Sequence, residues 1–139
     1  PPRSTPLYSS AASDVYKRQV FGIYMLRLVF EWLRTQGGLG AVAACNTRKA
    51  SILYEERDRS EFYRSVANRT CRSMMNVTFR LAKQDLEPRF IQEAAAAGLD
   101  GLRGHRTVGG LRASIYNAMP EEGVMALTEF MREFERSNG

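Results

Sequence analysis

Hydrophobic residues recur at helical spacing in the first half of the chain. They predict a helix from Phe21 to Gln36, which the glycine pair Gly37-Gly38 ends in the position where glycine commonly terminates helices. The stripe is formed by Ile23, Leu26, Phe30 and Leu33, widened by Met25, Leu28, Val29 and Trp32. A helix that is apolar on most sides needs a large covering surface, so we expect residues 20–38 to come from a larger domain.

The next segment predicts a second helix from Leu39 to Arg59. Its apolar stripe is weaker, and we interpret "RKASILYEERDRS" as a charged outer face. Such a helix suits a connection between two domains. We expect residues 39–139, with this helix at their start, to form a small domain. We interpret "SEFYRSVANRT", which follows it, as a turn region with aromatic anchors.

After residue 70 the pattern of hydrophobic and polar residues changes from helical spacing to alternation every two residues. "SMMNVTFRL" (73–81) alternates as a half-buried strand does. Asp85 is a candidate N-cap for a helix that carries Pro88 in its first turn and ends at Gly98. "LDGLRGH" is a candidate short strand.

"GLRASIYN" is a clearer strand, with Leu111, Ala113 and Ile115 on one face. Pro120 and two glutamates open a last helix. Its predicted buried stripe comprises Val124, Leu127, Phe130, Met131 and Phe134. The order strand, helix, strand, strand, helix predicts an α/β fold: a small sheet with helices on one face.

Composition narrows the classes of function. The chain has 139 residues and a net charge of +5, and 17 of its 20 basic residues are arginine. These arginines are scattered among acidic residues, which favours solvated helix faces over a nucleic-acid surface. Cys45 and Cys71 form no CxxC pair, so neither a metal site nor a redox motif is supported, and free thiols suit a cytoplasmic protein. Charges interrupt the apolar run after Val20, so we expect no membrane span or targeting segment.

The N-terminal segment differs from the rest. Residues 1–19 show no periodicity, are rich in serine and proline, and join a strong helix abruptly. "SDVYKRQ" resembles translated adapter sequence, so we expect these residues to be non-native or disordered. A native disordered tail is the alternative.

Candidate chemistry gathers in "GHRTVGGLRASIYN" (104–117). We expect a hairpin-like turn over Thr107–Gly110 to bring His105, Arg106 and Arg112 together. Glycines permit positive φ and leave room beside the backbone, while arginine grips carboxylate or phosphate oxygens with two nitrogens. The residues therefore suggest an anion site. A solvated surface turn is the alternative.

Several segments, in order, resemble the phosphoserine aminotransferases, a family of class V pyridoxal-phosphate-dependent aminotransferases. They are "FGIYMLRLVFEWLRTQGGL", "FYRS", "SMMNVTFRLA" and "GLRGHRTVGGLRASIYNAMPEEGVMALTEFMREFE". The resemblance covers about residues 21–139, the last third of such an enzyme. It implies the C-terminal small domain of a fold-type I transferase, preceded by helices of the large domain. It also implies pyridoxal 5'-phosphate as cofactor and a homodimer in serine biosynthesis.

The resemblance also implies roles for individual residues. His105 and Arg106 would hold the substrate phosphate and Arg112 the carboxylate of phosphoserine or 3-phosphohydroxypyruvate, with glutamate and 2-oxoglutarate as the other pair. The family's "NTPPT" segment is not found before Phe21, and Leu111, Thr78 and Met74 depart from the family pattern.

The catalytic lysine is the main departure from the family. None of Lys17, Lys49 and Lys83 lies in the context of the Schiff-base lysine, so this chain by itself is expected to hold no cofactor and to be inactive. The alternative function is a stand-alone, non-catalytic α/β module that binds a phosphorylated or acidic amino acid.

Overall fold

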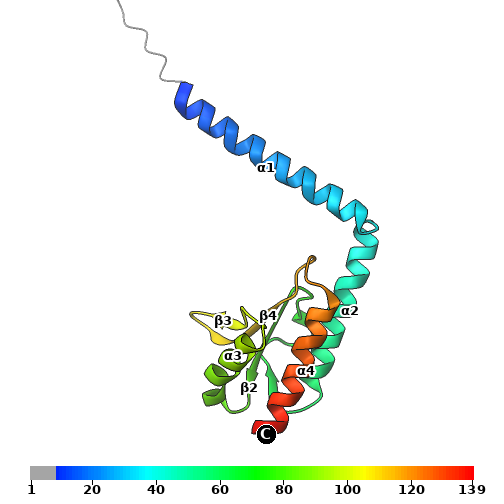
Figure 1. Cartoon of the computed structure of the whole chain (residues 1–139), viewed down its shortest axis with the longest axis vertical. Coiled ribbons are helices and arrows are strands. Elements are labelled where there is room, and N and C mark those ends of the chain that lie inside the picture. Colours follow the sequence, from blue (N-terminus) through cyan, green and yellow to red (C-terminus); the bar gives the residue numbers. More distant parts are fainter. Residues whose placement is uncertain (1–8) are drawn as a thin grey trace, which may run out of the picture. The chain divides into compact units, whose positions relative to one another are not determined.

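The computed structural model describes the backbone of residues 9–139 and the side chains of residues 19–139 (Figure 1). Residues 1–8, part of the segment expected to be non-native or disordered, lie outside the described residues. The chain divides after Val42 into two compact units.

The first unit contains the long helix α1 (Ser9–Thr35). It begins well before the predicted start at Phe21, so residues 9–19 are helical where the sequence pattern indicated no regular structure. Alanine favours helix, and extending an existing helix costs less than nucleating one, so a segment without an apolar stripe can still be helical. The predicted end is confirmed: Gly37 has a φ of +90° and donates a 3.1 Å hydrogen bond to the carbonyl of Arg34.

The apolar side chains of α1 are exposed in this unit. They include Phe21 and Ile23, each about two-thirds exposed, and the run continues to Trp32. This agrees with the expectation that the helix needs a covering surface. Among the described helices, none combines the length and apolar character needed to cross a bilayer.

The second unit is built on a four-stranded antiparallel sheet in the order β1-β2-β4-β3. Its strands are β1 (Tyr63–Ser65), β2 (Asn76–Leu81), β3 (Arg103–His105) and β4 (Gly109–Ser114). Short strands therefore form both edges, and the two six-residue strands lie in the middle.

Helices cover one face of this sheet (Figure 1). They are α2 (Gly38–Asp58), α3 (Glu87–Ala96) and α4 (Glu121–Asn138). The single 3-10 turn η1 (Arg69–Cys71) lies between β1 and β2, and η2 (Gln84–Leu86) lies between β2 and α3. The expected α/β class, a small sheet with helices on one face, is confirmed.

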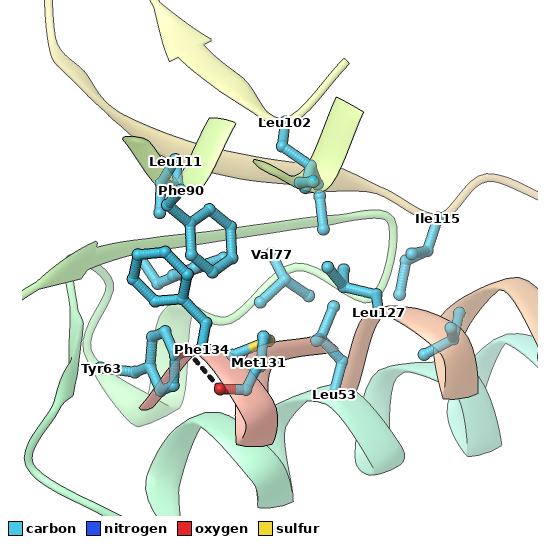
Figure 2. Close-up of a cluster of buried hydrophobic side chains, with 14 of the residues drawn as sticks. Leu53, Tyr63, Val77, Phe90, Leu102, Leu111, Ile115, Leu127, Met131 and Phe134 are labelled. Atoms are coloured by element: carbon cyan, nitrogen blue, oxygen red, sulfur yellow. Dashed lines mark hydrogen bonds between the residues drawn. The ribbon is translucent and has the colours of Figure 1, made fainter. Parts of the chain in front are cut away.

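The core follows the predicted alternation. Val77, Phe79 and Leu81 on β2 are buried, as are Leu111 and Ala113 on β4. They pack against aromatic and aliphatic residues of the three helices (Figure 2). The opposite face of the same strands is polar and only half-buried, so it is the face of the sheet that can carry chemistry.

Three local predictions are settled by the structure. The segment interpreted as a turn contains an edge strand, β1, which pairs with β2 through Tyr63 and Leu81. Asp85 is not the N-cap of α3, because it lies inside η2 and Leu86 occupies the cap without a side-chain bond. Gly98 does terminate α3: its φ is +81°, and the next residue donates a 2.8 Å bond back to Ala94.

The charged stretch of α2 is not uniformly an outer face. Lys49, Glu56 and Arg57 are buried, with exposures of 0–3%. Glu56 is paired with Arg59 and with Arg132 of α4, at 2.9 and 2.7 Å. Arg132 and the carbonyls that Lys49 contacts lie far away in sequence, so no local pattern reveals the partners that make the burial of Glu56 and Lys49 tolerable.

Candidate functional site

The predicted site lies on the hairpin formed by β3 and β4. His105 pairs with Gly109, and Val108 donates a 3.0 Å hydrogen bond to the carbonyl of His105. Gly109 and Gly110 have φ of +73° and +72°. A three-residue loop followed by a glycine in the left-handed region is a common hairpin connection, and it explains the glycine pair. The predicted turn is confirmed, although it is centred on residues 106–108.

Gly104 lets the two arms of this hairpin approach closely. A Cβ at this position would overlap the carbonyl oxygen of Gly109 and lie 2.6 Å from that of Gly110. Both obstacles are backbone atoms, which cannot rotate away. The glycine in "GHR" is therefore required by the packing of the hairpin on itself.

The space beside the glycine pair is occupied, contrary to the sequence interpretation that it is free for a ligand. Arg80 of β2 lies over both glycines, within 3.2 Å of where a Cβ would sit on each. Its guanidinium donates to the carbonyl of Val108 and, at 3.3 Å, to Gln84. The glycines thus admit a protein side chain from the neighbouring strand, and Arg80 fixes the tip of the hairpin.

His105 is exposed, and its ring is held on one side. Its Nδ1 lies 2.7 Å from the hydroxyl of Thr107 and accepts a longer bond, 3.4 Å, from the Thr107 backbone N–H. A nitrogen that accepts from a backbone N–H carries no proton in the neutral ring, so the proton lies on Nε2. The outer edge of the imidazole is thereby prepared to donate to an anion.

Two of the three arginines of the hairpin, Arg106 and Arg112, are the predicted ligands, and both have uncommitted donors. Arg106 is exposed at the turn, and Arg112 is half-buried on the polar face of β4, opposite Thr78 of β2. Within residues 19–139, no hydrogen bond or ion pair engages either guanidinium, and Arg112 Nε is buried without a partner. Both side chains can therefore accept an anionic ligand without breaking an existing contact.

The three predicted residues share the hairpin but occupy different places along it. His105 and Arg106 lie at its tip, whereas Arg112 lies three residues beyond Gly109, or roughly 10 Å along an extended strand. In the side chains that are described, no hydrogen bond joins the three. The arrangement suits a ligand with two anionic ends better than a single ion.

A polar network that the sequence reasoning did not single out continues the same face. The side-chain amide of Asn76 on β2 donates a 3.1 Å hydrogen bond to the Tyr116 hydroxyl. The hydroxyl of Ser114 donates a 3.2 Å hydrogen bond to the Asn76 amide oxygen. The two-residue alternation of "GLRASIYN" places Arg112, Ser114 and Tyr116 on one face, but it does not show that Asn76 joins them.

The lysines of the described side chains do not fit a covalent cofactor site. Lys49 is fully buried, and its Nζ donates to the carbonyls of Ile115, Tyr116 and Met119 at 3.3, 2.8 and 2.9 Å. An ammonium has three protons, so none is left over. Lys83 is exposed and donates to Asn138. Lys17 belongs to the part of α1 whose side chains lie outside the described residues.

Comparison with known proteins agrees with this fold. The family model described as aminotransferase class-V matches residues 15–127. Two phosphoserine aminotransferases, from Desulfosudis oleivorans and from a Marinomonas species, are each 56% identical over 120 and 119 residues. Each match covers 86% of this chain and 33% of the relative, so the chain spans about a third of the length of these curated relatives.

Solved structures show the same similarity. A phosphoserine aminotransferase from Bacillus circulans superposes with a TM-score of 0.83 at 43% identity, covering 99% of this chain and 40% of that one. The pyridoxal-phosphate-bound phosphoserine aminotransferase from Trichomonas vaginalis gives 0.75 at 31% identity, over 94% of this chain and 39% of that one. The resemblance inferred from the sequence motifs is confirmed, and the chain belongs to the class-V aminotransferase family.

Proposed function

We propose that the chain is the C-terminal part of a phosphoserine aminotransferase, which transfers an amino group between glutamate and 3-phosphohydroxypyruvate to give O-phospho-L-serine. The observation that carries this proposal is the β3–β4 hairpin: among the described residues, the guanidinium groups of Arg106 and Arg112 have no partner, and the His105 ring is engaged only at Nδ1. The 56% identity to two proteins of that name supports the same substrate class.

The family resemblance implies a role for each residue. His105 and Arg106, at the exposed tip, would bind the doubly charged phosphate end of the substrate. Arg112, further along β4, would bind the carboxylate. Guanidinium groups offer two parallel N–H donors to such oxygens, and the separation of tip and strand orients the substrate along the hairpin.

Pyridoxal phosphate, the cofactor of the family, supplies the electron sink of transamination when it is bound. The described residues do not fit this group: Lys49 is committed to three carbonyls, and Lys83 lies at the surface. We therefore assign no residue of this chain to the cofactor. The contribution of this chain is to bind and orient the substrate.

The domain assignment follows the same proposal. Residues 20–38 would belong to the large domain, whose surface would cover the exposed apolar side chains of α1. Residues 39–139 would form the small domain. We further propose a cytoplasmic homodimer acting in serine biosynthesis, as the family resemblance implies. The two cysteines, Cys45 and Cys71, are both free, in keeping with a reducing compartment.

An exchange experiment tests the proposal. The matching segment of the Desulfosudis oleivorans enzyme is replaced by that of this chain, and glutamate-dependent amination of 3-phosphohydroxypyruvate is measured. We expect an active hybrid. In it, Arg112→Met should lower kcat/KM by roughly ten- to a hundredfold, since a charged hydrogen bond contributes about 1.5–3 kcal/mol.

The control variant is Arg89→Met, which removes an exposed guanidinium paired only with Glu93 on α3. It should leave kcat/KM unchanged. A folded hybrid without activity would contradict the proposed function, and full activity of Arg112→Met would contradict the role of that residue alone.

The alternative, a stand-alone module that binds an acidic or phosphorylated amino acid, is favoured by one observation. Residues 43–139 form a unit with a continuous core of their own. Calorimetric titration of the whole chain with O-phosphoserine distinguishes the two: saturable binding by the chain alone supports the module, and its absence supports the need for the rest of the enzyme.

A further inference from the structure

Arg57 of α2 is a buried cation with unused donors. Its side chain is 1% exposed, and Nε, Nη1 and Nη2 all lack a hydrogen-bond partner among the described residues. Nη2 lies 2.6 Å from Asp58 Oδ1, which makes an ion pair but not an aligned hydrogen bond. Burying donors without acceptors is costly, so a further acceptor at this place would be stabilised.

A single carboxylate serves three guanidinium groups here. Besides Arg57, Asp58 pairs with Arg72 at 2.8 Å and with Arg69 at 3.6 Å. The ring of Tyr54 stacks with two of them, at 5.3 Å from Arg57 and 4.8 Å from Arg72. Burial lowers the pKa of Arg57, although Asp58 opposes this shift. Three guanidinium groups around one carboxylate leave the cluster with an excess of positive charge.

A cavity of about 610 Å³ opens beside this cluster. It lies where the end of α2, strand β1 and the turn η1 meet. Serine and asparagine side chains add neutral polar groups to its wall. Four arginines and two acidic residues line it, which gives its wall a net charge of +2: Arg57, Arg64, Arg69, Arg72, Asp58 and Glu61. Its volume is in the range of sites for small molecules.

This cavity is distinct from the hairpin. β1 forms one edge of the sheet and β3 the other, with β2 and β4 between them. Three strand spacings of about 4.8 Å separate the two edges by roughly 14 Å. A small anion cannot contact both places, so binding at one does not require binding at the other.

We propose that Arg57, Arg69 and Arg72, with Asp58 as their shared carboxylate, form a second anion-binding site that takes a phosphate group, as inorganic phosphate or on a phosphorylated metabolite. A phosphate carries up to two negative charges and several acceptor oxygens, which match the excess charge of the wall and the empty donors of Arg57. A carboxylate would neutralise only half of that charge. The proposal does not depend on the proposed function.

The test uses the whole chain and inorganic phosphate, titrated calorimetrically against a background of potassium chloride at matched ionic strength. The variant Arg106→Met serves as the reference, because it weakens any phosphate binding at the hairpin. We expect saturable binding in this reference, and at least a tenfold loss of affinity when Arg69→Met or Arg57→Met is added. Arg89→Met, which does not line the cavity, should have no effect.

Arg69 keeps the test decisive if Arg57→Met disturbs folding, since the Arg69 side chain is 80% exposed and its replacement leaves the core intact. No saturable binding in the reference, or unchanged affinity in both cluster variants, overturns the proposal. Glycerol 3-phosphate distinguishes the sources: tighter binding than inorganic phosphate indicates a metabolite, and equal binding indicates the free ion.

Discussion

The hydroxyl of Tyr63 donates a 2.7 Å hydrogen bond to the backbone carbonyl of Met131, and so ties the edge strand β1 to α4 across the core (Figure 2). The ring of Tyr63 also meets Phe79 and Phe90 edge to face, with centroids 5.8 and 6.2 Å apart. β1 has only three residues. The side chain of Tyr63, more than the backbone ladder of β1, therefore holds this strand in place.

The buried hydroxyl predicts a loss of stability in alkali. Burial raises the pKa of Tyr63, with smaller contributions from Glu135 and Glu56. Below the pKa of the unfolded tyrosine, about 10, the contribution is complete. Above that pH the unfolded chain releases a proton that the folded chain retains, so stability falls by up to about 1.4 kcal/mol per pH unit. Urea unfolding between pH 8 and 11 measures this slope.

Tyr63→Phe is the matched control for this slope. It should be about 1 kcal/mol less stable than the parent at pH 8, because one hydrogen bond is lost. It should also show a shallower decline in alkali. The same slope in both proteins would mean that Tyr63 is not responsible.

Lys49 predicts a second effect on stability. Its ammonium joins α2 to the segment after β4 through three carbonyls. Lys49→Met keeps the length of the side chain but leaves those carbonyls unpaired, which should cost about 2–4 kcal/mol in urea unfolding. Lys83→Met, which removes one exposed bond of 3.3 Å, should change stability by less than about 0.5 kcal/mol. Equal effects would contradict a structural role for Lys49.

The sequence pattern predicted the strands and helices that have one buried apolar face and one polar face. β2 and β4 alternate because one face is buried and the other polar, and α4 has a regular stripe. β1 was missed, because three residues are too few to show a period. The buried Lys49 was missed for another reason: its partners lie 66 to 70 residues away, where no local pattern records them.

In the candidate site, too, some features follow from local sequence and others depend on residues that are distant in sequence. The hairpin and its positive-φ glycines follow from local sequence, and motif resemblance singles out His105, Arg106 and Arg112. The position of Arg80 depends on strand register, since Phe79 pairs with Leu111 and so brings Arg80 beside Gly110. The cavity beside Arg57 depends on three segments meeting, and composition indicated only scattered arginines.

Arg80 predicts a dynamic effect on the hairpin. Arg80→Met removes the bond to the Val108 carbonyl and the contact with Gln84. The hairpin tip should open more often, so the Val108 amide should exchange with solvent roughly tenfold faster, while global stability falls by about 1–2 kcal/mol. Hydrogen exchange followed by NMR measures both. Arg89→Met provides the comparison, and unchanged exchange at Val108 would exclude a role of Arg80 at the tip.

Of the substitutions considered, a change at Gly104 should have the most local effect on the structure, because it acts on the hairpin itself. In Gly104→Ala the new methyl group would overlap the backbone of the facing arm, at Gly109 and Gly110. The two arms must separate, which should cost about 1–3 kcal/mol in thermal or urea unfolding. Because His105 and Arg106 follow directly, O-phosphoserine binding by an active hybrid enzyme should weaken as well.

Gly40→Ala is the matched control for this substitution. Gly40 lies in α2 with nothing within 4 Å of its would-be Cβ and no positive φ, so alanine there should stabilise the chain by about 0.4–1 kcal/mol. The opposite signs of the two substitutions separate close packing from the general effect of replacing glycine. If Gly104→Ala were also stabilising, the arms of the hairpin would not approach as closely as described, and the positions assigned to His105 and Arg106 would have to change with them.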